Sequence, residues 1–282
     1  RSRNLDYISQ NLINLTNQTP AKRIFEAINT YSESSEVRYV GGCVRKIIKK
    51  EIVDDIDLAT NLKPSEVCDA LKKQDINYYE TGIEHGTITA IIDDHKYEIT
   101  SLRKDVSTDG RHAKIEFSSD WKEDAARRDF SINSIYSDKD GNLFDPYNGK
   151  KDLESGNIKF IGDSENRIKE DYLSILRYVR FFLNYSNQSH DINVIKKIKK
   201  NIGGISKLSS ERLLDEFKKL TRSNAFLKIF NDEISLDLIE IIFPQLKNLE
   251  NFKKLNLYAL DNLSKVDFIF LLSLLIIDGT DN

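Results

Sequence analysis

The sequence predicts an α+β protein in which a mixed α/β region is followed by an all-helical region. Residues 22–150 alternate strand-like apolar runs with helical stretches, which is typical of a small mixed domain. From about residue 163 onward helical periodicity dominates, as in Ser209–Phe217, where a serine stands at the expected helix start. With 282 residues and 39% hydrophobic content, the chain is long enough for one large or two smaller packed domains.

A glycine turn near the start of the mixed region predicts a phosphate-binding element. Val37–Val40 is predicted to be a strand, Gly41 and Gly42 a tight turn, and Val44–Lys50 a helix. The N–H groups at the start of that helix would attract phosphate, and Arg45 in its first turn could add a direct contact. The patterns GxxxxGK[ST] and GxGxxG are both missing at this turn, so neither of those nucleotide-binding fingerprints applies.

Two aspartates and one glutamate predict a cluster of carboxylates. Asp55 and Asp57 are two positions apart, so on a strand their side chains point the same way, while Ile56 faces the core. Tyr97–Thr100 is a second alternating strand, which could bring Glu98 beside the pair. Such oxygen ligands suit Mg²⁺ and the phosphoryl transfer that carboxylate-bound metals support. Taken alone, an Asp-x-Asp pair is more typical of a solvated strand end than of a metal site.

Two further segments place arginines where they could meet a nucleotide. Arg127 and Arg128 stand just before an apolar segment and could clamp a triphosphate, although a charged helix N-terminus is the plainer interpretation. Tyr172–Leu183 is apolar nearly all round, and a buried arginine within it needs a carboxylate or a ligand. The polar residues recur every three positions, which predicts either a nucleotide-facing stripe or an internal ion-pair network; they are Asp171, Ser174, Arg177 and Arg180.

Composition limits the partners and the setting. The net charge is only −3, so an RNA-binding surface must be local, and a basic stretch offers either that surface or a merely solvated face through Lys196, Lys197, Lys199 and Lys200. Two cysteines are too few for a disulfide framework, which predicts a reduced cytoplasm. The apolar run 268–277 is too short to span a bilayer and predicts a buried helix, so no membrane partner is expected.

Two local predictions concern segments without a clear pattern. Residues 103–114 are polar and lack apolar periodicity, which predicts a mobile loop. His190 stands in polar surroundings and is predicted to lie at the surface.

The order of these motifs, GGxVR, DxD, a strand glutamate, RRDFxIN and EDxxxxxR, resembles that of the class II tRNA nucleotidyltransferases, the CCA-adding enzymes, which are close relatives of bacterial poly(A) polymerases. The resemblance runs from about Arg38 to Leu220. It implies a nucleotidyltransferase head with a mixed sheet and helices, followed by a helical neck and body. The expected division is residues 1–21 as an N-terminal lead, 22–150 as the head, 151–222 as the neck and 223–282 as the start of the body.

The resemblance also implies a role for each matched residue. Asp55 and Asp57 would hold Mg²⁺, and Glu98 matches the third acidic residue of the family. The nucleotide would be contacted by a second set of residues, namely Gly42, Arg45, Arg128, Asp171, Arg177 and Arg180. The implied reaction adds CCA to the 3′ end of tRNA from CTP and ATP and releases pyrophosphate. In this family a flexible loop in the interval 103–114 accompanies complete CCA addition.

One position departs from the family pattern. Ser174 stands where the family has an arginine, and a serine cannot form a planar, bidentate donor fork. We therefore expect weaker discrimination against UTP and GTP, unless another arginine takes its place. The alternatives are a poly(A) polymerase, a catalytically weak RNA-binding relative, and a metal-dependent phosphohydrolase. The last of these would leave the arginine stripe without a purpose.

Overall fold

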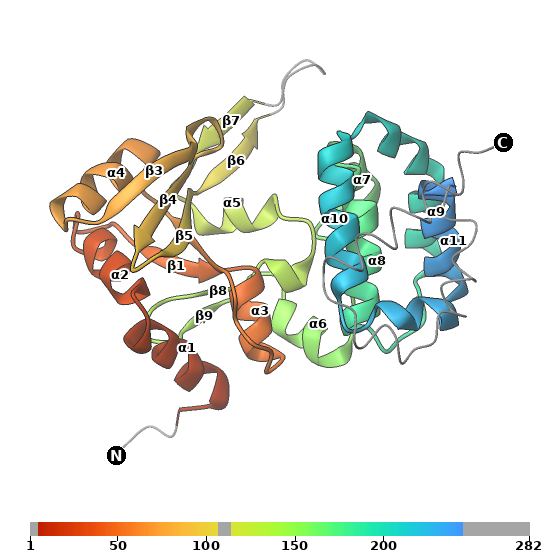
Figure 1. Cartoon of the computed structure of the whole chain (residues 1–282), viewed down its shortest axis with the longest axis horizontal. Coiled ribbons are helices and arrows are strands. Elements are labelled where there is room, and N and C mark those ends of the chain that lie inside the picture. The colour runs from red at the N-terminus through yellow and green to blue at the C-terminus, as the bar shows by residue number, and fades with distance from the viewer. Residues whose placement is uncertain (1–4, 107–113, 245–282) are drawn as a thin grey trace. The chain divides into compact units, whose positions relative to one another are not determined.

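The computed structural model describes residues 5–106 and 114–244. The described residues form two compact units, which are divided in the chain between Gly162 and Asp163. Unit 1 mixes strands and helices, whereas unit 2 is built from helices (Figure 1). The α+β prediction is confirmed, while the expected division at residues 21, 150 and 222 stays a prediction.

Unit 1 is organised around a seven-stranded sheet with the order β3-β4-β5-β2-β1-β8-β9. β2 and β5 pair in parallel, and the other neighbours in this sheet pair antiparallel. The strands predicted at residues 37–40 and 97–100 are both present. The bounds are β1 Val37–Val40, β2 Ile56–Thr60, β3 Asn77–Gly82, β4 Thr87–Ile92, β5 His95–Ser101, β8 Tyr136–Ser137 and β9 Leu143–Phe144.

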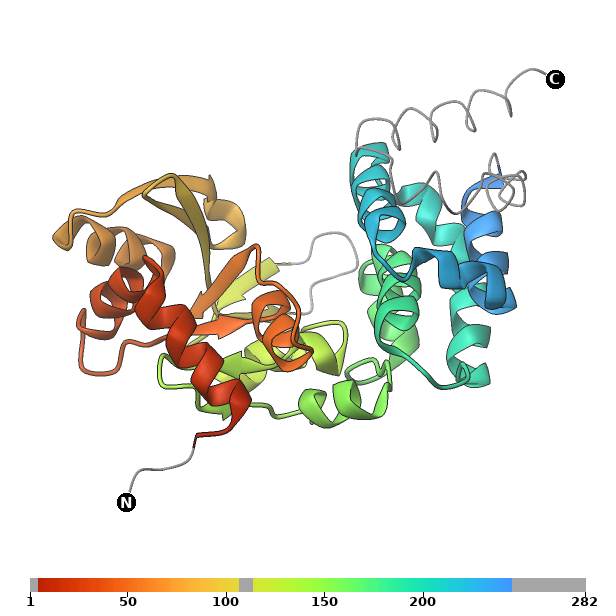
Figure 2. The same cartoon turned by 60° about the horizontal axis from the view of Figure 1, so that its bottom comes forward.

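Helices cover both faces of this sheet. α2 and α4 pack against β1 and β4, and α1 packs on α2 and α3 (Figure 2). On this side Phe25 lies against Tyr39, with ring centroids 4.9 Å apart, and the Tyr39 hydroxyl lies 2.7 Å from Thr16 Oγ1. The bounds are α1 Tyr7–Gln18, α2 Ala21–Asn29, α3 Gly42–Ile48, α4 Pro64–Lys73, α5 Trp121–Ala126 and α6 Gly149–Ser155, with short 3₁₀ turns η1 Ile83–His85 and η2 Ser131–Asn133.

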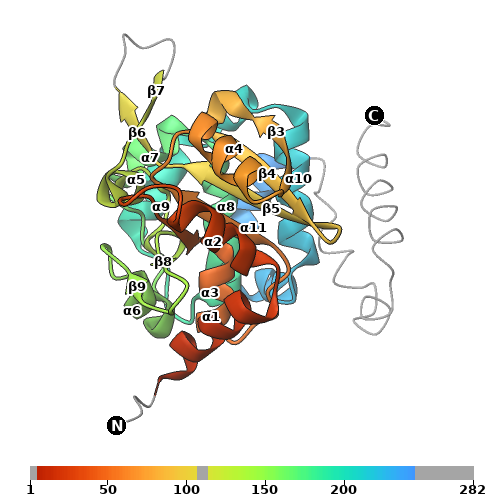
Figure 3. The same ribbon diagram turned by 90° about the vertical axis from the view of Figure 1, so that its left-hand side faces the viewer.

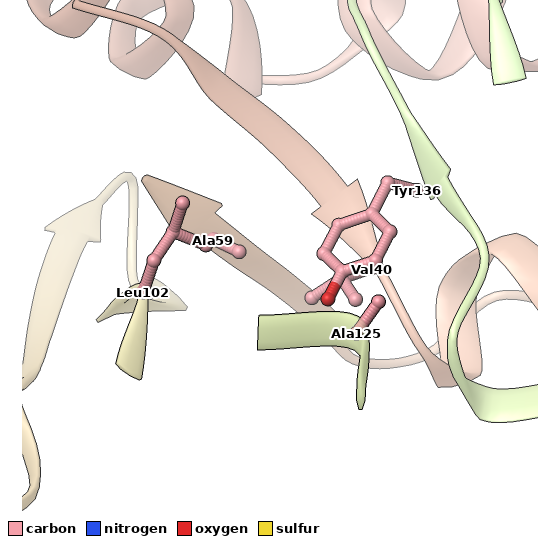
Figure 4. Close-up of a cluster of buried hydrophobic side chains, with 5 residues drawn as sticks. All are labelled: Val40, Ala59, Leu102, Ala125 and Tyr136. Atoms are coloured by element: carbon pink, nitrogen blue, oxygen red, sulfur yellow. The ribbon is translucent and has the colours of Figure 1, made fainter. Parts of the chain in front are cut away.

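A buried cluster joins the other face of the sheet to α5. Five side chains, each 4% exposed or less, form it: Val40, Ala59, Leu102, Ala125 and Tyr136 (Figure 4). Trp121 and Phe144 pack around them, partly buried. The cluster fixes α5 and the residues just after β5 against the centre of the sheet, because displacing either would expose apolar surface.

A two-stranded ribbon, β6 Arg103–Val106 and β7 Lys114–Phe117, stands apart from the main sheet (Figures 1 and 3). The expectation of an irregular loop over 103–114 is therefore wrong at both ends of that segment. The two arms pair in antiparallel register from Arg103–Phe117 to Val106–Lys114, so backbone pairing, rather than apolar periodicity, orders them. Residues 107–113 of the predicted loop lie outside the described residues.

Unit 2 consists of helices, in agreement with the periodicity of the sequence. Aspartate or serine side chains cap the starts of most of them, and Ser209 accepts a hydrogen bond from the Arg212 N–H at 3.2 Å as predicted. No helix within the described parts of the chain is both long and apolar enough to cross a bilayer. The bounds are α7 Ser164–Glu170, α8 Leu173–Tyr185, α9 Ile192–Asn201, η3 Ile202–Lys207, α10 Ser210–Arg222, η4 Phe226–Asn231 and α11 Glu233–Ile242.

Candidate active site

The sheet brings two of the three predicted carboxylates together. Asp57 on β2 is in register with Glu98 on the neighbouring parallel strand β5, and both are exposed. Residues paired in this way project from the same face of a sheet on strands about 4.8 Å apart. The third carboxylate differs from the prediction, because β2 begins at Ile56 and Asp55 lies in the coil before it. The Asp54 side chain accepts a hydrogen bond from the Asp55 N–H at 2.9 Å and forms an ion pair with Lys46. These contacts hold the backbone at Asp55 outside the strand.

The donor chemistry of this pair suits a hard divalent cation. Within residues 5–106 and 114–244, no group of three or more histidine, cysteine or acidic side chains is arranged to hold a metal ion. Magnesium, however, usually keeps several waters and takes only one or two carboxylates from the protein, with substrate phosphates as further ligands. Asp57 and Glu98 meet that requirement, with Asp55 two residues before Asp57 along the chain.

The glycine turn leads directly into α3. Gly41 has a φ of +71°, a conformation that L side chains rarely adopt, and α3 begins at Gly42, two residues earlier than predicted. A Cβ at Gly42 would lie 3.6 Å from Nη2 of Arg45. Arg45 is only 7% exposed, and it donates a hydrogen bond to Asn133 Oδ1. Arg45 therefore links the glycine turn to the RRDFxIN segment, because Asn133 is the asparagine of that segment. The sequence did not single out Asn133.

The thiol beside this turn is inert. Burial, reinforced by the nearby Asp57 carboxylate, raises the pKa of Cys43 to about 12. Since the thiolate is the reactive form, Cys43 is a packing residue rather than a nucleophile or a metal ligand.

Arg127 and Arg128 share one buried carboxylate that the sequence did not single out. Asp124, 1% exposed, accepts hydrogen bonds from Nε of Arg127 at 3.0 Å and from Nη2 of Arg128 at 3.1 Å. Tyr136 donates its hydroxyl to the same carboxylate at 2.6 Å. Burial would raise the pKa of Asp124, but Arg128, Arg127 and the Tyr136 hydrogen bond outweigh burial and lower it to about 2. The helix N-terminus considered for these arginines is wrong, because α5 ends just before Arg127.

In unit 2 the polar stripe, which begins at Asp171 between α7 and α8 and continues along α8, meets charged partners on α10. Asp171 accepts a fork of hydrogen bonds from Arg212, at 2.8 and 3.3 Å. Arg180 donates to Glu216 at 2.5 Å, and Glu216 is 2% exposed. The internal network that we considered, from Asp171 to Arg177, is thus replaced for Asp171 by a pairing between helices. Arg212 and Glu216 share one face of α10 because they are four residues apart, and that shared charged face is the pattern in the sequence that could have indicated the pairing.

The remaining stripe residues lie along the same helix. The Arg177 guanidinium stands 5.1 Å from the centre of the Phe181 ring. Ser174 is 5% exposed, and its N–H donates to the Asp171 carbonyl at 3.1 Å. Ser174, where the family pattern has an arginine, therefore lies within one helical turn of Asp171 and the two hydrogen bonds that Arg212 donates to it.

His190 does not lie at the surface as predicted, since its side chain is only 5% exposed. Nδ1 lies 2.7 Å from the Tyr178 hydroxyl, and Nε2 lies 2.8 Å from an Asp232 oxygen. The imidazole also stacks on the Phe182 ring, with centroids 3.5 Å apart. Two aromatic residues of α8 and an aspartate 42 residues further along the chain enclose the ring, so its polar sequence neighbours gave the wrong expectation.

Three of the four lysines predicted to bind RNA form ion pairs on the surface of unit 2. Lys197 lies 4.0 Å from Asp163, Lys199 lies 3.0 Å from Asp237, and Lys200 lies 3.0 Å from Glu165. Exposed pairs of this kind contribute about 0–1 kcal/mol, so they leave the lysines able to change partners. Lys196 is exposed on the same helix, α9.

The glycine turn, the in-register carboxylates and the arginine cluster define unit 1 as a nucleotidyltransferase head. Residues 37–159 match the family model described as "Poly A polymerase head domain", and residues 191–250 match "Probable RNA and SrmB- binding site of polymerase A". The chain belongs to the family of poly(A) polymerases and tRNA nucleotidyltransferases, enzymes that generally need a divalent metal ion.

The chain is similar in sequence to CCA-adding enzymes of this family from animals and bacteria. The chain is 39% identical over 228 residues to the human "CCA tRNA nucleotidyltransferase 1, mitochondrial", which covers 79% of this chain and 52% of the relative. It is 33% identical over 256 residues to the "CCA-adding enzyme" of Lactobacillus johnsonii, covering 86% of this chain and 62% of the relative. The chain thus spans about half the length of its mammalian relatives.

Solved structures give the same result. The Bacillus stearothermophilus CCA-adding enzyme in complex with CTP superimposes with a TM-score of 0.66 and 27% identity, covering 78% of this chain and 50% of that one. A tRNA-processing enzyme in an apo form superimposes with a TM-score of 0.70 over 95% of this chain and 71% of that one, at 23% identity, a likeness that concerns the fold alone.

Proposed function

We propose that this chain adds CCA to the 3′ end of tRNA without a nucleic-acid template, using CTP and ATP and releasing pyrophosphate. The observation that carries the proposal is the pairing of Asp57 with Glu98 across β2 and β5, in a unit that matches the polymerase head model. Relatives named as CCA-adding enzymes support the same activity. The activity remains a proposal, because the chain spans only about half of the human relative.

In this proposal the head binds the metal and the triphosphate. Asp55, Asp57 and Glu98 would hold Mg²⁺, which would favour loss of the proton from the attacking 3′-hydroxyl and offset charge on the triphosphate. Gly42 lets phosphate approach the backbone of the turn, and Arg45, held by Asn133, faces the same segment. Arg128 would bind phosphate from the position in which Asp124 holds it.

Base recognition is assigned to α8 of the helical unit. Asp171 and Arg177 would contact the edge of CTP or ATP, and Arg180 would contact nucleotide or hold α8 through Glu216. We further propose that Arg212 supplies the planar donor group beside Asp171 that Ser174 lacks, because its fork already engages that carboxylate at 2.8 and 3.3 Å.

The RNA and the division of the chain complete the proposal. The lysines of α9, with Lys196 foremost, would contact phosphates of the tRNA. The head would comprise residues 22–150, the neck 151–222 and the start of the body 223–282. A cytoplasmic location stays a prediction from the cysteine content, and the human relative is described as mitochondrial.

The test is extension of a tRNA transcript that lacks its 3′ CCA, resolved to single nucleotides. Mg²⁺ is supplied with CTP, ATP, UTP or GTP alone and with CTP and ATP together. Addition of two C and one A followed by arrest supports the proposal. A long A ladder would identify a poly(A) polymerase instead, and binding of tRNA without extension would identify an RNA-binding relative.

A further inference from the structure

Three arginines of unit 1 converge on a single carboxylate. Besides Arg127 and Arg128, Arg103 at the start of β6 reaches Asp124 with its backbone N–H, at 3.1 Å from Oδ1. Leu102 and Ala125, which Figure 4 draws as members of the buried cluster, are the sequence neighbours of Arg103 and Asp124. The buried cluster thus anchors the backbone that carries Arg103 and Asp124.

Asp124 has no hydrogen-bonding capacity left for the Arg103 side chain. Its Oδ1 accepts from Arg127 at 2.9 and 3.0 Å and from the Arg103 N–H. Its Oδ2 accepts from Arg128 at 3.1 and 3.3 Å and from Tyr136 at 2.6 Å. A carboxylate offers about four lone-pair sites, and six donors already point at this one.

The Arg103 guanidinium therefore lacks a full set of hydrogen-bond acceptors and counter-charges. Its Nε is buried and has no hydrogen-bond partner among the described residues. Burial and repulsion from Arg127 and Arg128 lower the pKa of Arg103 to about 10, because Asp124 and Asp105 offset them only in part. Arg103, Arg127 and Arg128 share Asp124 as a counter-charge in a partly desolvated place, and Asp105 is a further acidic neighbour of Arg103. Removing a donor and a charge from water without a partner is unfavourable, so this site favours an anion.

The position of the cluster indicates which anion fits. Tyr136, which contacts both Asp124 and Arg128, lies on β8 and pairs with Val40, the residue immediately before the Gly41–Gly42 turn. Guanidinium groups recognise phosphate oxygens by paired N–H donors. We propose that Arg103 binds polyphosphate, namely the terminal phosphates of the incoming nucleotide and the pyrophosphate that leaves. This inference deepens the proposed function by adding a residue that the sequence motifs did not indicate.

Inorganic pyrophosphate is the probe, titrated by calorimetry into the whole chain in buffer with a chelator, so that no metal contributes. Arg103→Gln should weaken pyrophosphate binding by about 10- to 100-fold, as expected for one charge-assisted contact. Arg103→Lys keeps the charge without the fork and should fall between the two, and it also serves if the glutamine variant does not fold. Circular dichroism melts establish that each variant is folded.

Arg38→Gln is the matched control. Arg38 is also partly buried in the sheet, but Glu36 pairs with it at 2.8 Å and its guanidinium lies 4.0 Å from the Trp121 ring, so its charge is already compensated. This variant should bind pyrophosphate within about twofold of the original chain. Unchanged binding in both Arg103 variants, an equal loss in Arg38→Gln, or no binding by the unaltered chain would overturn the inference.

The same experiment separates this inference from the proposed function. If tRNA extension fails while pyrophosphate binding depends on Arg103, the polyphosphate site stands and CCA addition does not. If extension succeeds while Arg103→Gln binds pyrophosphate like the original chain, CCA addition stands and the site does not.

Discussion

The two units of the chain neutralise their arginines in opposite ways. In unit 1, Arg103, Arg127 and Arg128 share the one carboxylate of Asp124. In unit 2, two arginines each engage a carboxylate of their own, Arg180 with Glu216 and Arg212 with Asp171. Arginines that share one carboxylate suit a polyphosphate ligand. An arginine paired with its own carboxylate instead fixes the rotation and spacing of the segments it joins. A nucleotide base that bound such an arginine would have to share it with that carboxylate.

The largest effect should follow from removing one carboxylate of unit 1. Asp57→Asn keeps the shape of the side chain but loses its charge, so we expect nucleotide addition to fall by about 10⁴-fold, since metal stabilisation contributes several kcal/mol and each 1.4 kcal/mol is tenfold. Single-turnover extension of a tRNA primer measures the fall. Binding of tRNA by filter retention should remain nearly intact, and an equal loss of binding would mean that the substitution disturbs the fold.

A matched pair in unit 2 should affect stability rather than chemistry. Glu216→Ala leaves the Arg180 guanidinium partly buried without its carboxylate, and breaking a buried pair costs about 3–5 kcal/mol. Urea unfolding followed by circular dichroism measures this loss. Asp215→Ala is the control on the same helix, because Asp215 is exposed and pairs with Lys219 at 3.5 Å, so its cost should stay below about 1 kcal/mol. Equal costs for the two variants would mean that the buried Arg180–Glu216 pair stabilises the fold no more than an exposed pair does.

Acid should destabilise the folded chain by protonating Asp124, the carboxylate that three arginines of unit 1 share. The pKa of Asp124 is lowered from 3.8 to about 2, so its ionised form stabilises the folded chain by about 2 kcal/mol. That contribution is complete above about pH 4 and is lost as the pH falls towards 2, because over this range the unfolded chain binds a proton at this carboxylate more readily than the folded chain does. Trp121, the only tryptophan of the chain, lies on α5 with Asp124, and its fluorescence can follow unfolding.

The comparison variants for this pH dependence are Asp124→Asn and Asp140→Asn. The first removes the titrating group, so its stability should change less between pH 4 and pH 2 than that of the original chain. The second changes an exposed turn residue and should leave the profile as it was. A profile that Asp124→Asn does not alter would mean that another group governs acid unfolding.

The sequence predicted what depends on local pattern and on the order of motifs. The strands at 37–40 and 97–100, the helical second half and the Ser209 cap follow from periodicity and capping chemistry. What it missed depends on contacts between distant segments. Glu216 acquires its role only when α8 brings Arg180 to it, Asp124 gains the Tyr136 hydroxyl and the Arg103 N–H from other strands, and His190 is enclosed by Tyr178 and Asp232.

The smallest expected effect concerns base selectivity, and it tests whether the Asp171–Arg212 pair of unit 2 also recognises the nucleotide base. Ser174 lies one helical turn from Asp171, so Ser174→Arg places a second guanidinium within reach of the carboxylate that Arg212 now engages. If a planar fork at this position sharpens selectivity, discrimination against UTP and GTP should rise by about tenfold, the value of one such contact. Rates of incorporation for the four nucleotides, measured as kcat/KM, give the selectivity.

Two variants distinguish a fork from a mere charge at this position. Ser174→Lys adds a cation without the planar donor group and should sharpen selectivity less than Ser174→Arg. Arg212→Lys should relax selectivity in the original chain if Arg212 already serves as the donor beside Asp171. Because the Arg212–Asp171 pair is about half exposed, with side chains 50% and 43% accessible, its loss should change stability little and leave base choice as the readout. Equal selectivity in all four chains would confine this pair to holding α8 and α10 together.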